Sequence, residues 1–167
     1  MNLDGGINDV SVPGIAGRLW LCGKHVIGPD VEATMLRVAA DHVVCLVREH
    51  ELEGRYDHYV EWLKIETRQT ETRATWYPIH DLSSPPLAEI LPLYRDVADR
   101  VRSGETVVAH CAAGIGRAGT LAVAVCQLLG MSLDTALTHV RLHRPGAGPE
   151  VGTQLDAVTE LATLLDR

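Results

Sequence analysis

The segment at residues 107–120 constrains the fold more than any other part of the chain. It reads VVAHCAAGIGRAGT: a β-branched run ends in a cysteine, a loop with two glycines follows, and an apolar stretch begins. A short β-branched run is typical of a buried strand, and the apolar stretch after Arg117 is long enough for a helix. We therefore expect a strand, a tight loop and a helix in direct succession, with Cys111 where the strand ends.

The loop between Cys111 and Arg117 has five residues, AAGIG. A loop of this length that closes onto the first turn of a helix can direct consecutive backbone N–H groups at a tetrahedral anion. Gly114 and Gly116 permit the turn because they lack a Cβ atom. The predicted phosphate-binding residues are Ala112, Ala113, Gly114, Ile115, Gly116 and Arg117.

The same surroundings act on the sulfur of Cys111. Oriented amides, a helix N-terminus and the guanidinium of Arg117 all favour negative charge, so we expect a thiolate, the nucleophilic form of cysteine. The planar fork of Arg117 suits two phosphate oxygens at once. The alternative, a buried core cysteine followed by a surface arginine, requires several independent coincidences of spacing and composition.

His110, Cys111, Gly114, Gly116 and Arg117 form a His-Cys-x5-Arg pattern. This pattern resembles the signature loop of the cysteine-based protein tyrosine phosphatases, especially the small dual-specificity type. The resemblance implies a compact α/β phosphatase that needs no cofactor and works through a phosphocysteine intermediate. It is strongest in the middle of the chain, around the cysteine loop and the segment that precedes it.

Ala118 departs from this family pattern, which has serine or threonine directly after the arginine. In the family that hydroxyl helps the cysteine to leave when water attacks the phosphocysteine. Phosphatases of the regenerating-liver type are similar to this chain in carrying alanine there. The resemblance therefore implies slow turnover, with a burst of product followed by slower steady hydrolysis.

Thiolate attack on a phosphate monoester requires a proton for the leaving oxygen, and another loop at the same sheet edge must supply it. Asp81 is the best candidate, because it follows a predicted strand at residues 75–79 and precedes LSSPP, a segment that could close over substrate. The sequence PIHD that ends at Asp81 is similar to the acid loop of dual-specificity enzymes and of cyclin-dependent-kinase-associated phosphatase. A turn residue or helix cap is the alternative for Asp81, and Glu89, within a predicted helix, is the fallback acid.

Other side chains are candidates for supporting roles. His110 could hydrogen-bond behind the loop, with a satisfied core histidine as an equal alternative. Gln154 stands where relatives carry a glutamine near the catalytic water. Arg48 and His50 could line the rim of the pocket, although a solvated charged loop is the simpler interpretation. Cys45 is interpreted as a core residue, with a protective disulfide to an oxidised catalytic cysteine as the alternative.

Strand and helix patterns alternate along the chain. Strands are predicted at residues 18–22, 42–47, 75–79 and 106–109, and helices at residues 31–40, 56–65, 87–101, 117–129, 132–143 and 151–165. Pro92 predicts a kink or a separate first turn in its helix, and residues 1–17 are predicted to be an irregular lead-in. This order predicts one α/β domain over residues 1–167, with a central, mostly parallel sheet of four to five strands flanked by helices. Anions bind at the carboxyl ends of strands in such sheets, which is where Cys111 falls.

Composition narrows the choice of partners. A net charge of −7 argues against nucleic acid and acidic membranes as partners. The chain has neither a signal peptide nor an apolar run of about 18 residues or more, so a cytoplasmic protein with no membrane partner is expected. Its four cysteines, Cys22, Cys45, Cys111 and Cys126, are scattered, which suits reduced thiols better than disulfides or a metal site. The sequence leaves the oligomeric state open.

These features predict a metal-independent phosphatase that acts on phosphotyrosine, and also on phosphoserine or phosphothreonine, in a protein or peptide. Cys111 attacks phosphorus, Arg117 and the loop amides bind the phosphate oxygens, and Asp81 protonates the leaving oxygen. Phosphate, sulfate and vanadate are the expected ligands of the loop. Two alternatives remain: a phosphoinositide or other non-protein phosphatase, disfavoured by a loop without lysine, and a non-catalytic module that binds phosphorylated ligands.

Overall fold

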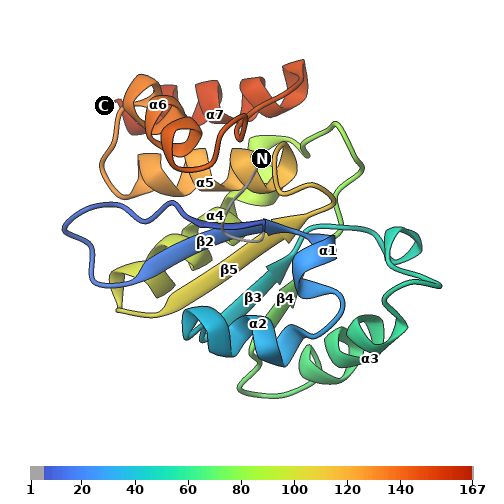
Figure 1. The fold of residues 1–167 in the computed structure, drawn as a ribbon. Helices are drawn as coiled ribbons and strands as arrows, with labels where there is room; N and C mark the ends of the chain where they lie inside the picture. The colour runs from blue at the N-terminus through green and yellow to red at the C-terminus, as the bar shows by residue number, and fades with distance from the viewer. Residues whose placement is uncertain (1–5, 167) are drawn as a thin grey trace.

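The computed structural model describes residues 6–166 and places five strands in a single sheet (Figure 1). The strands are β1 (Ile7–Asp9), β2 (Arg18–Gly23), β3 (His42–Cys45), β4 (Ala74–Trp76) and β5 (Thr106–Cys111). Their order across the sheet is β1-β2-β5-β3-β4. Only β1 is antiparallel to its neighbour, and the other pairs are parallel. The predicted α/β class with a mostly parallel sheet is confirmed.

Helices cover both faces of this sheet, with α4 to α7 on one side and α1 to α3 on the other (Figure 1). Their bounds are α1 (Lys24–Ile27), α2 (Val31–Val38), α3 (Asp57–Glu66), α4 (Leu87–Arg102), α5 (Arg117–Leu128), α6 (Leu133–His143) and α7 (Gly152–Leu165), with a short 3-10 turn, η1 (Glu49–Glu51), after β3. Because both faces are covered, the central strands β3 and β5 are almost entirely buried, which explains their continuous apolar sequence.

The helix α5 is the centre of the molecule. Eleven of its 12 residues are buried, from Arg117 to Gln127, because it packs against the sheet, α4, α6 and α7 at once. A helix that is apolar on all sides is suited to such a position. The strand β5 ends directly below its N-terminus, so the loop between them is held at the carboxyl edge of the sheet by the two most buried elements.

The structure corrects the predicted irregular lead-in at residues 1–17. Ile7–Asp9 forms the edge strand β1, in which Ile7 lies opposite Cys22 of β2. Ile7 and Val10 are fully buried, so tertiary packing rather than local propensity fixes this strand. Three residues among glycine, asparagine and proline carry too little alternation to be recognised from sequence. Residues 1–5 of the predicted lead-in lie outside the described residues.

Two further boundaries differ from the predicted ones. The strand β4 ends at Trp76, although the chain beyond it stays close to β3, with the amide of Ile79 donating to the carbonyl of Leu46 at 2.9 Å. The helix α4 continues through Pro92, so its first turn is not a separate element. Among residues 6–166, no helix combines the length and apolar character needed to cross a membrane.

Candidate active site

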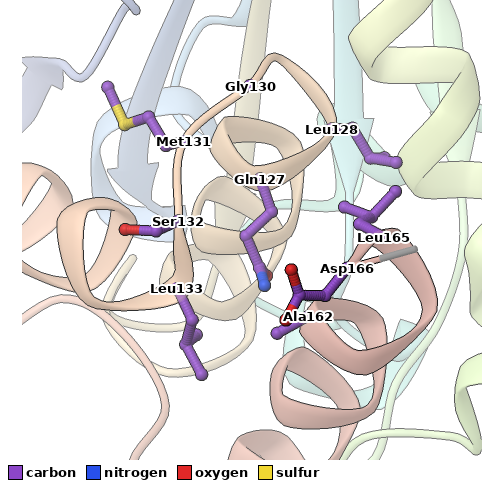
Figure 2. A pocket seen from close by; sticks show the side chains of 9 residues that line it. All are labelled: Gln127, Leu128, Gly130, Met131, Ser132, Leu133, Ala162, Leu165 and Asp166. Atoms are coloured by element: carbon purple, nitrogen blue, oxygen red, sulfur yellow. The ribbon is translucent and has the colours of Figure 1, made fainter.

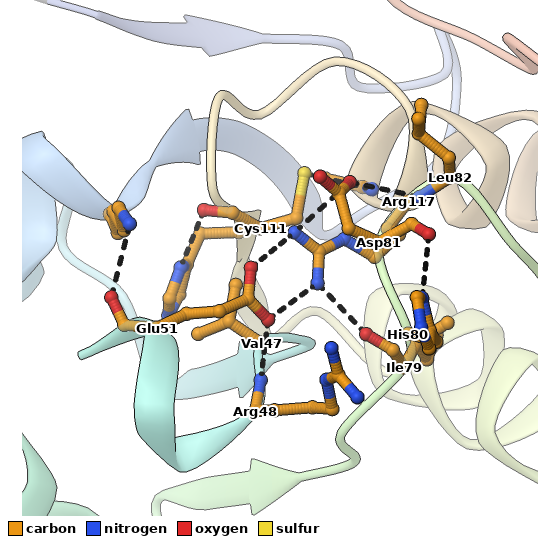
Figure 3. Close-up of polar contacts among 12 residues, drawn as sticks. Val47, Arg48, Glu51, Ile79, His80, Asp81, Leu82, Cys111 and Arg117 are labelled. Atoms are coloured by element: carbon orange, nitrogen blue, oxygen red, sulfur yellow. Dashed lines mark hydrogen bonds and ion pairs between the residues drawn. The ribbon is translucent and has the colours of Figure 1, made fainter. Parts of the chain in front are cut away.

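Cys111 is the last residue of β5 and lies where the sequence predicts it, immediately before the loop that leads into α5 (Figure 3). Its side chain is buried, and the sulfur accepts a hydrogen bond from the amide of Ala118 at 3.4 Å. An amide of the first helical turn that points at the sulfur favours negative charge there. We refer to residues 111–117 as the phosphate loop.

The carbonyls in the first half of the phosphate loop all point away from its concave side. The carbonyl of Ala112 accepts from the amide of Lys24 at 3.0 Å. Those of Ala113 and Gly114 accept from the guanidinium of Arg144 at 3.0 and 2.7 Å. In a trans peptide the C=O and the next N–H point in opposite directions. The three amides that follow these carbonyls are therefore directed to the inside of the loop.

The second half of the loop is held in the same manner. The carbonyl of Ile115 accepts from the amides of Gly119 and Gly148, both at 3.0 Å. The carbonyl of Gly116 accepts from the amide and the hydroxyl of Thr120, at 2.8 and 2.7 Å. These bonds direct the next amides to the same concave side, which is the arrangement that the glycine-bearing loop predicts for binding an anion.

Gly114 is required by its backbone conformation and a close backbone contact, whereas Gly116 meets only side chains. Gly114 has a φ of +74°, and a Cβ there would lie 2.4 Å from the carbonyl oxygen of Cys22. A Cβ on Gly116 would lie 2.1 Å from a carboxylate oxygen of Glu150. The loop therefore excludes a side chain at Gly114, whereas at Gly116 the exposed Glu150 side chain would have to move.

Arg117 is buried, and its guanidinium spans the site (Figure 3). Its two Nη atoms donate to the two carboxylate oxygens of Glu51, each at 2.9 Å, and Nη1 also donates to the carbonyl of Ile79 at 2.8 Å. This bidentate pairing fixes the plane of the fork. Its Nε is buried and has no hydrogen-bond partner among the described residues. An unpaired buried donor beside the phosphate loop is a position for a ligand oxygen.

Glu51 is the functional residue that the sequence analysis missed. Burial raises its pKa, but hydrogen bonds from Arg117 and from the amide of Arg48 outweigh this effect and hold the pKa below its ordinary value. It is therefore ionised at neutral pH. The sequence signal that could have identified Glu51 is a carboxylate just after a buried strand, at the same sheet edge as Cys111. Arg48 and His50, the residues predicted at the rim, precede it in the chain.

Asp81 lies at the mouth of the site with a side chain 60% exposed (Figure 3). One carboxylate oxygen is 3.4 Å from Nη2 of Arg117 and accepts from the amide of Leu82 at 2.9 Å. Leu82 has a φ of +57°, a backbone conformation that residues other than glycine rarely adopt. The structure thus brings Asp81, Arg117 and Cys111 into one site, with Asp81 on an exposed and locally strained segment.

Gln154 lies beside the phosphate loop at the start of α7 and is buried. Its amide nitrogen is 3.3 Å from the position of a Cβ on Gly116 and donates to the carbonyl of Ser83 at 3.4 Å. Its oxygen accepts from the amide of Glu150 at 2.7 Å. Gln154 is thus placed between the phosphate loop and the segment that follows Asp81, and Glu150 is a neighbouring carboxylate that the sequence analysis did not select.

His110 is fully buried behind the phosphate loop. Its Nε2 lies 2.6 Å from the hydroxyl of Tyr59 and its Nδ1 lies 3.2 Å from the carbonyl oxygen of Cys111. Burial lowers the pKa of His110 to about 4, so the ring is neutral at neutral pH. Its contacts are therefore those of a polar residue that supports the end of β5, rather than of a cation.

Cys45 lies opposite His110 in the β3–β5 register. Neighbouring residues of a strand point to opposite faces, so the side chains of Cys45 and Cys111 leave the sheet on different sides. Burial raises the pKa of Cys45 to about 12, as it does for Cys22. These surroundings favour core packing as the role of Cys45.

A separate hollow of about 570 Å³ lies at the other end of the helical layer, where α5 and α7 end (Figure 2). Its walls include Gln127, Met131, Leu133, Leu165 and Asp166. None of the three predicted catalytic residues lines it, so this hollow is separate from the candidate active site.

Comparison with known families agrees with this geometry. Residues 18–156 match the family model described as Swiss Army Knife protein, DSP-PTPase phosphatase domain. The chain belongs to this phosphatase family. The match spans the sheet from β2 onward, the phosphate loop, Asp81 and Gln154. The resemblance to the small dual-specificity type of cysteine-based phosphatase is thereby confirmed. No curated protein matches the chain.

Solved structures of phosphatases share the fold. Tk-PTP in its active form is 29% identical, with a TM-score of 0.68, over 93% of this chain and 96% of that protein. Kinase associated phosphatase with its catalytic cysteine replaced by serine is 19% identical, with a TM-score of 0.74, over 96% and 94% of the two chains. PTPMT1 in complex with PI(5)P is 16% identical, with a TM-score of 0.71, over 96% of each chain.

Proposed function

We propose that this phosphatase domain hydrolyses phosphotyrosine, and also phosphoserine or phosphothreonine, in proteins through a phosphocysteine intermediate. The observation that carries the proposal is the unpaired, buried Nε of Arg117 beside a loop whose carbonyls are all held outward. Such a loop offers several N–H donors to a tetrahedral oxyanion and turns its own carbonyls away from it. Electrostatic preorganisation of this kind stabilises the charge of a phosphoryl-transfer transition state.

In the first step the thiolate of Cys111 attacks phosphorus, the P–S bond forms and the ester P–O bond breaks. Asp81, once it has left Arg117 and taken up a proton from solvent, gives that proton to the leaving oxygen. In the second step Asp81 takes a proton from water, which attacks phosphorus and releases the thiolate. The loop amides and the Nε of Arg117 bind the non-bridging oxygens throughout.

The ion pair between Asp81 and Arg117 supports an exchange of partners on substrate binding. At 3.4 Å in an exposed setting this pair is weak. A phosphate dianion in the loop would compete for the same guanidinium and favour release of Asp81 toward the leaving oxygen. Glu51 keeps its bidentate contact and holds the fork of Arg117 in place during the exchange.

The loop side chains favour simple monoesters as substrates. Ala112, Ala113 and Ile115 contribute no cation to the loop. A headgroup with several phosphates would need further positive charge near the loop. The fold itself permits lipid substrates, because PTPMT1 is similar in fold and its structure holds PI(5)P. The choice between protein and lipid substrates therefore needs a direct comparison.

The test measures hydrolysis of an aryl phosphate, a phosphopeptide panel and a phosphoinositide panel by the full chain. We expect turnover of the aryl phosphate and of phosphotyrosine peptides, inhibition by vanadate, and loss of turnover in Cys111→Ser. The serine variant should still bind vanadate, because the loop amides and Arg117 remain. Turnover of phosphoinositides alone would contradict the protein substrate, and activity retained by Cys111→Ser would contradict the mechanism.

A further inference from the structure

Arg144 lies behind the phosphate loop, just after α6, and is almost completely buried. All three nitrogens of its guanidinium donate hydrogen bonds. In addition to the carbonyls of Ala113 and Gly114, it donates from Nη1 to the carbonyl of Gly6 at 3.0 Å and to the side-chain oxygen of Asn8 at 2.8 Å. One side chain thus joins the phosphate loop to the edge strand β1.

The partners of Arg144 are all neutral oxygens, three carbonyls and one carboxamide. Among residues 6–166, no carboxylate forms an ion pair with it. Burial lowers the pKa of Arg144, and this effect outweighs the opposite effect that the ionised forms of Cys22 and Cys111 have on it. Because arginine stays protonated in proteins, this is a buried positive charge without a carboxylate to offset it.

The opposite is true of Arg117 on the other side of the loop. Glu51 pairs with it through both oxygens, and Asp81 lies 3.4 Å from the same Nη2. Two carboxylates therefore offset one guanidinium, and this group of three has no net positive charge while both carboxylates are ionised. The chain as a whole has a net charge of −7. The positive potential that an anion needs comes from the loop amides, the start of α5, Arg144, and Lys24, whose ammonium donates to the carbonyl of Glu51 at 3.0 Å.

We propose that Arg144 is a positioning residue that supplies a buried, uncompensated positive charge behind the phosphate loop. Its charge favours the thiolate form of Cys111 and draws a phosphate into the loop from behind. Its planar fork holds two loop carbonyls outward, so that the following amides point at the phosphate. This inference rests on the proposed phosphatase function and assigns a role to a residue that touches neither the sulfur nor the substrate.

The physical basis is that charge acts over distance in a poorly hydrated interior, whereas exposed charges are screened. Arg141 provides the matched comparison, because it belongs to the same helix α6 but is exposed. Removing either arginine changes the net charge equally. Only removal of the buried one should change the ionisation of Cys111.

The experiment measures the rate of alkylation by iodoacetamide against pH, and the affinity for vanadate, for the full chain. The buried thiols of Cys22, Cys45 and Cys126 have pKa values raised to about 12, and Cys111→Ser gives their background rate. In Arg144→Gln we expect the alkylation midpoint to rise by about one pH unit and vanadate affinity to fall about tenfold. Arg141→Gln should keep both values of the unmodified chain.

Arg144→Lys separates charge from hydrogen bonding, because it keeps the cation and loses the fork. We expect it to keep the alkylation midpoint of the unmodified chain while vanadate binds more weakly. A folded Arg144→Gln with an unchanged midpoint would overturn the proposal. If Arg144→Gln does not fold, a midpoint raised in Arg144→Lys would overturn it as well. Neither readout needs turnover, so an unmodified chain that binds vanadate and hydrolyses no monoester would contradict the proposed function alone.

Discussion

The phosphate loop and the segment at residues 79–86, the acid loop, face each other across the site but are built in different ways. In the phosphate loop the carbonyls from Ala112 to Gly116 each have a partner in a buried element. In the acid loop Asp81 and Leu82 are largely exposed. The acid loop is tied to α7 through the amide of Ser84, which donates to the hydroxyl of Thr153 at 3.2 Å.

This difference matches the two tasks. A site that stabilises a transition state gains most from donors that are already in place. A group that gives a proton to a departing oxygen must approach after the substrate has bound, and exposed segments with few buried contacts are the ones that move. The phosphate loop should therefore be equally ordered with and without substrate, whereas the position of Asp81 should depend on substrate.

Replacing the proposed acid, Asp81, should distinguish the roles of the two loops most clearly. Asp81→Asn should lower kcat by about 10² to 10⁴ for substrates with poor leaving groups, because the proton donor is lost. The loss should be smaller for aryl phosphates with good leaving groups. Vanadate affinity should change little, since the phosphate loop is untouched. Steady-state kinetics over a series of leaving groups measures this.

Glu89→Gln is the control for this experiment. Glu89 is exposed in the first turn of α4 and was the fallback acid in the sequence analysis. It should leave both kcat and its dependence on the leaving group unchanged. If the leaving-group dependence followed Glu89 and not Asp81, the assignment of the acid loop would be wrong.

Glu51 joins the two regions, because Arg117 contacts both Glu51 and the carbonyl of Ile79 in the acid loop. Glu51→Gln weakens a charge-assisted, bidentate contact and frees the fork to rotate. We expect a loss in kcat/KM of about tenfold to 100-fold, the size associated with a misplaced catalytic group. Glu53→Gln, an exposed neighbour in the same segment, should show none. Equal effects of the two substitutions would mean that local charge, and not the position of Arg117, matters.

The sequence predicts the phosphate loop more completely than the residues that support it. The phosphate loop is local: nucleophile, glycines and arginine lie within residues 111–117, so spacing alone predicts the site. Glu51 and Arg144 reach this loop from 66 and 30 or more residues away. Their side chains give no pattern of their own, because charged residues after a strand or a helix are common on surfaces. Only tertiary structure shows that both point inward.

The fold was predicted well where burial is continuous. The strands β3 and β5 and the helix α5 are mostly apolar because they are covered on every side. The edge strand β1 was missed because three residues paired on one side carry almost no periodic signal. It is held in part by Arg144, which bonds to Gly6 and Asn8.

A smaller effect is expected from Ala118, which lies within the preorganised region. Its amide already donates to the sulfur of Cys111 at 3.4 Å. Ala118→Ser would add a hydroxyl donor that stabilises the thiolate when the phosphocysteine is hydrolysed. We expect steady turnover to rise by up to about tenfold, the value of one hydrogen bond to a charged group, and the initial burst to disappear. Rapid-quench kinetics measures both, and an absent burst in the unmodified chain would contradict slow hydrolysis of the intermediate.

Two buried histidines should make the stability of the fold depend on pH. Burial lowers the pKa of both His42 and His110 from 6.5 to about 4. Between these values the unfolded chain binds more protons than the folded one, so stability falls as pH falls from 6.5 to 4. Two histidines give a maximum slope of about 2 to 3 kcal/mol per pH unit. Urea unfolding across this range measures it.

The exposed His58 is the control for the pH dependence. His58→Gln should leave the slope unchanged, whereas His110→Gln should reduce it by about half, since one of the two buried histidines is removed. A slope that does not change in His110→Gln would mean that this ring is not held neutral in the folded protein.

Trapping the reaction intermediate tests the central claim most directly, that Cys111 attacks a phosphate held by preorganised amides. Acid quenching during turnover of an aryl phosphate, followed by peptide mass spectrometry, should find one phosphoryl group on the peptide that contains Cys111. The fraction trapped should be high, because Ala118 slows its hydrolysis. Turnover with no phosphoryl group on this peptide, or with the group on another residue, would contradict the account.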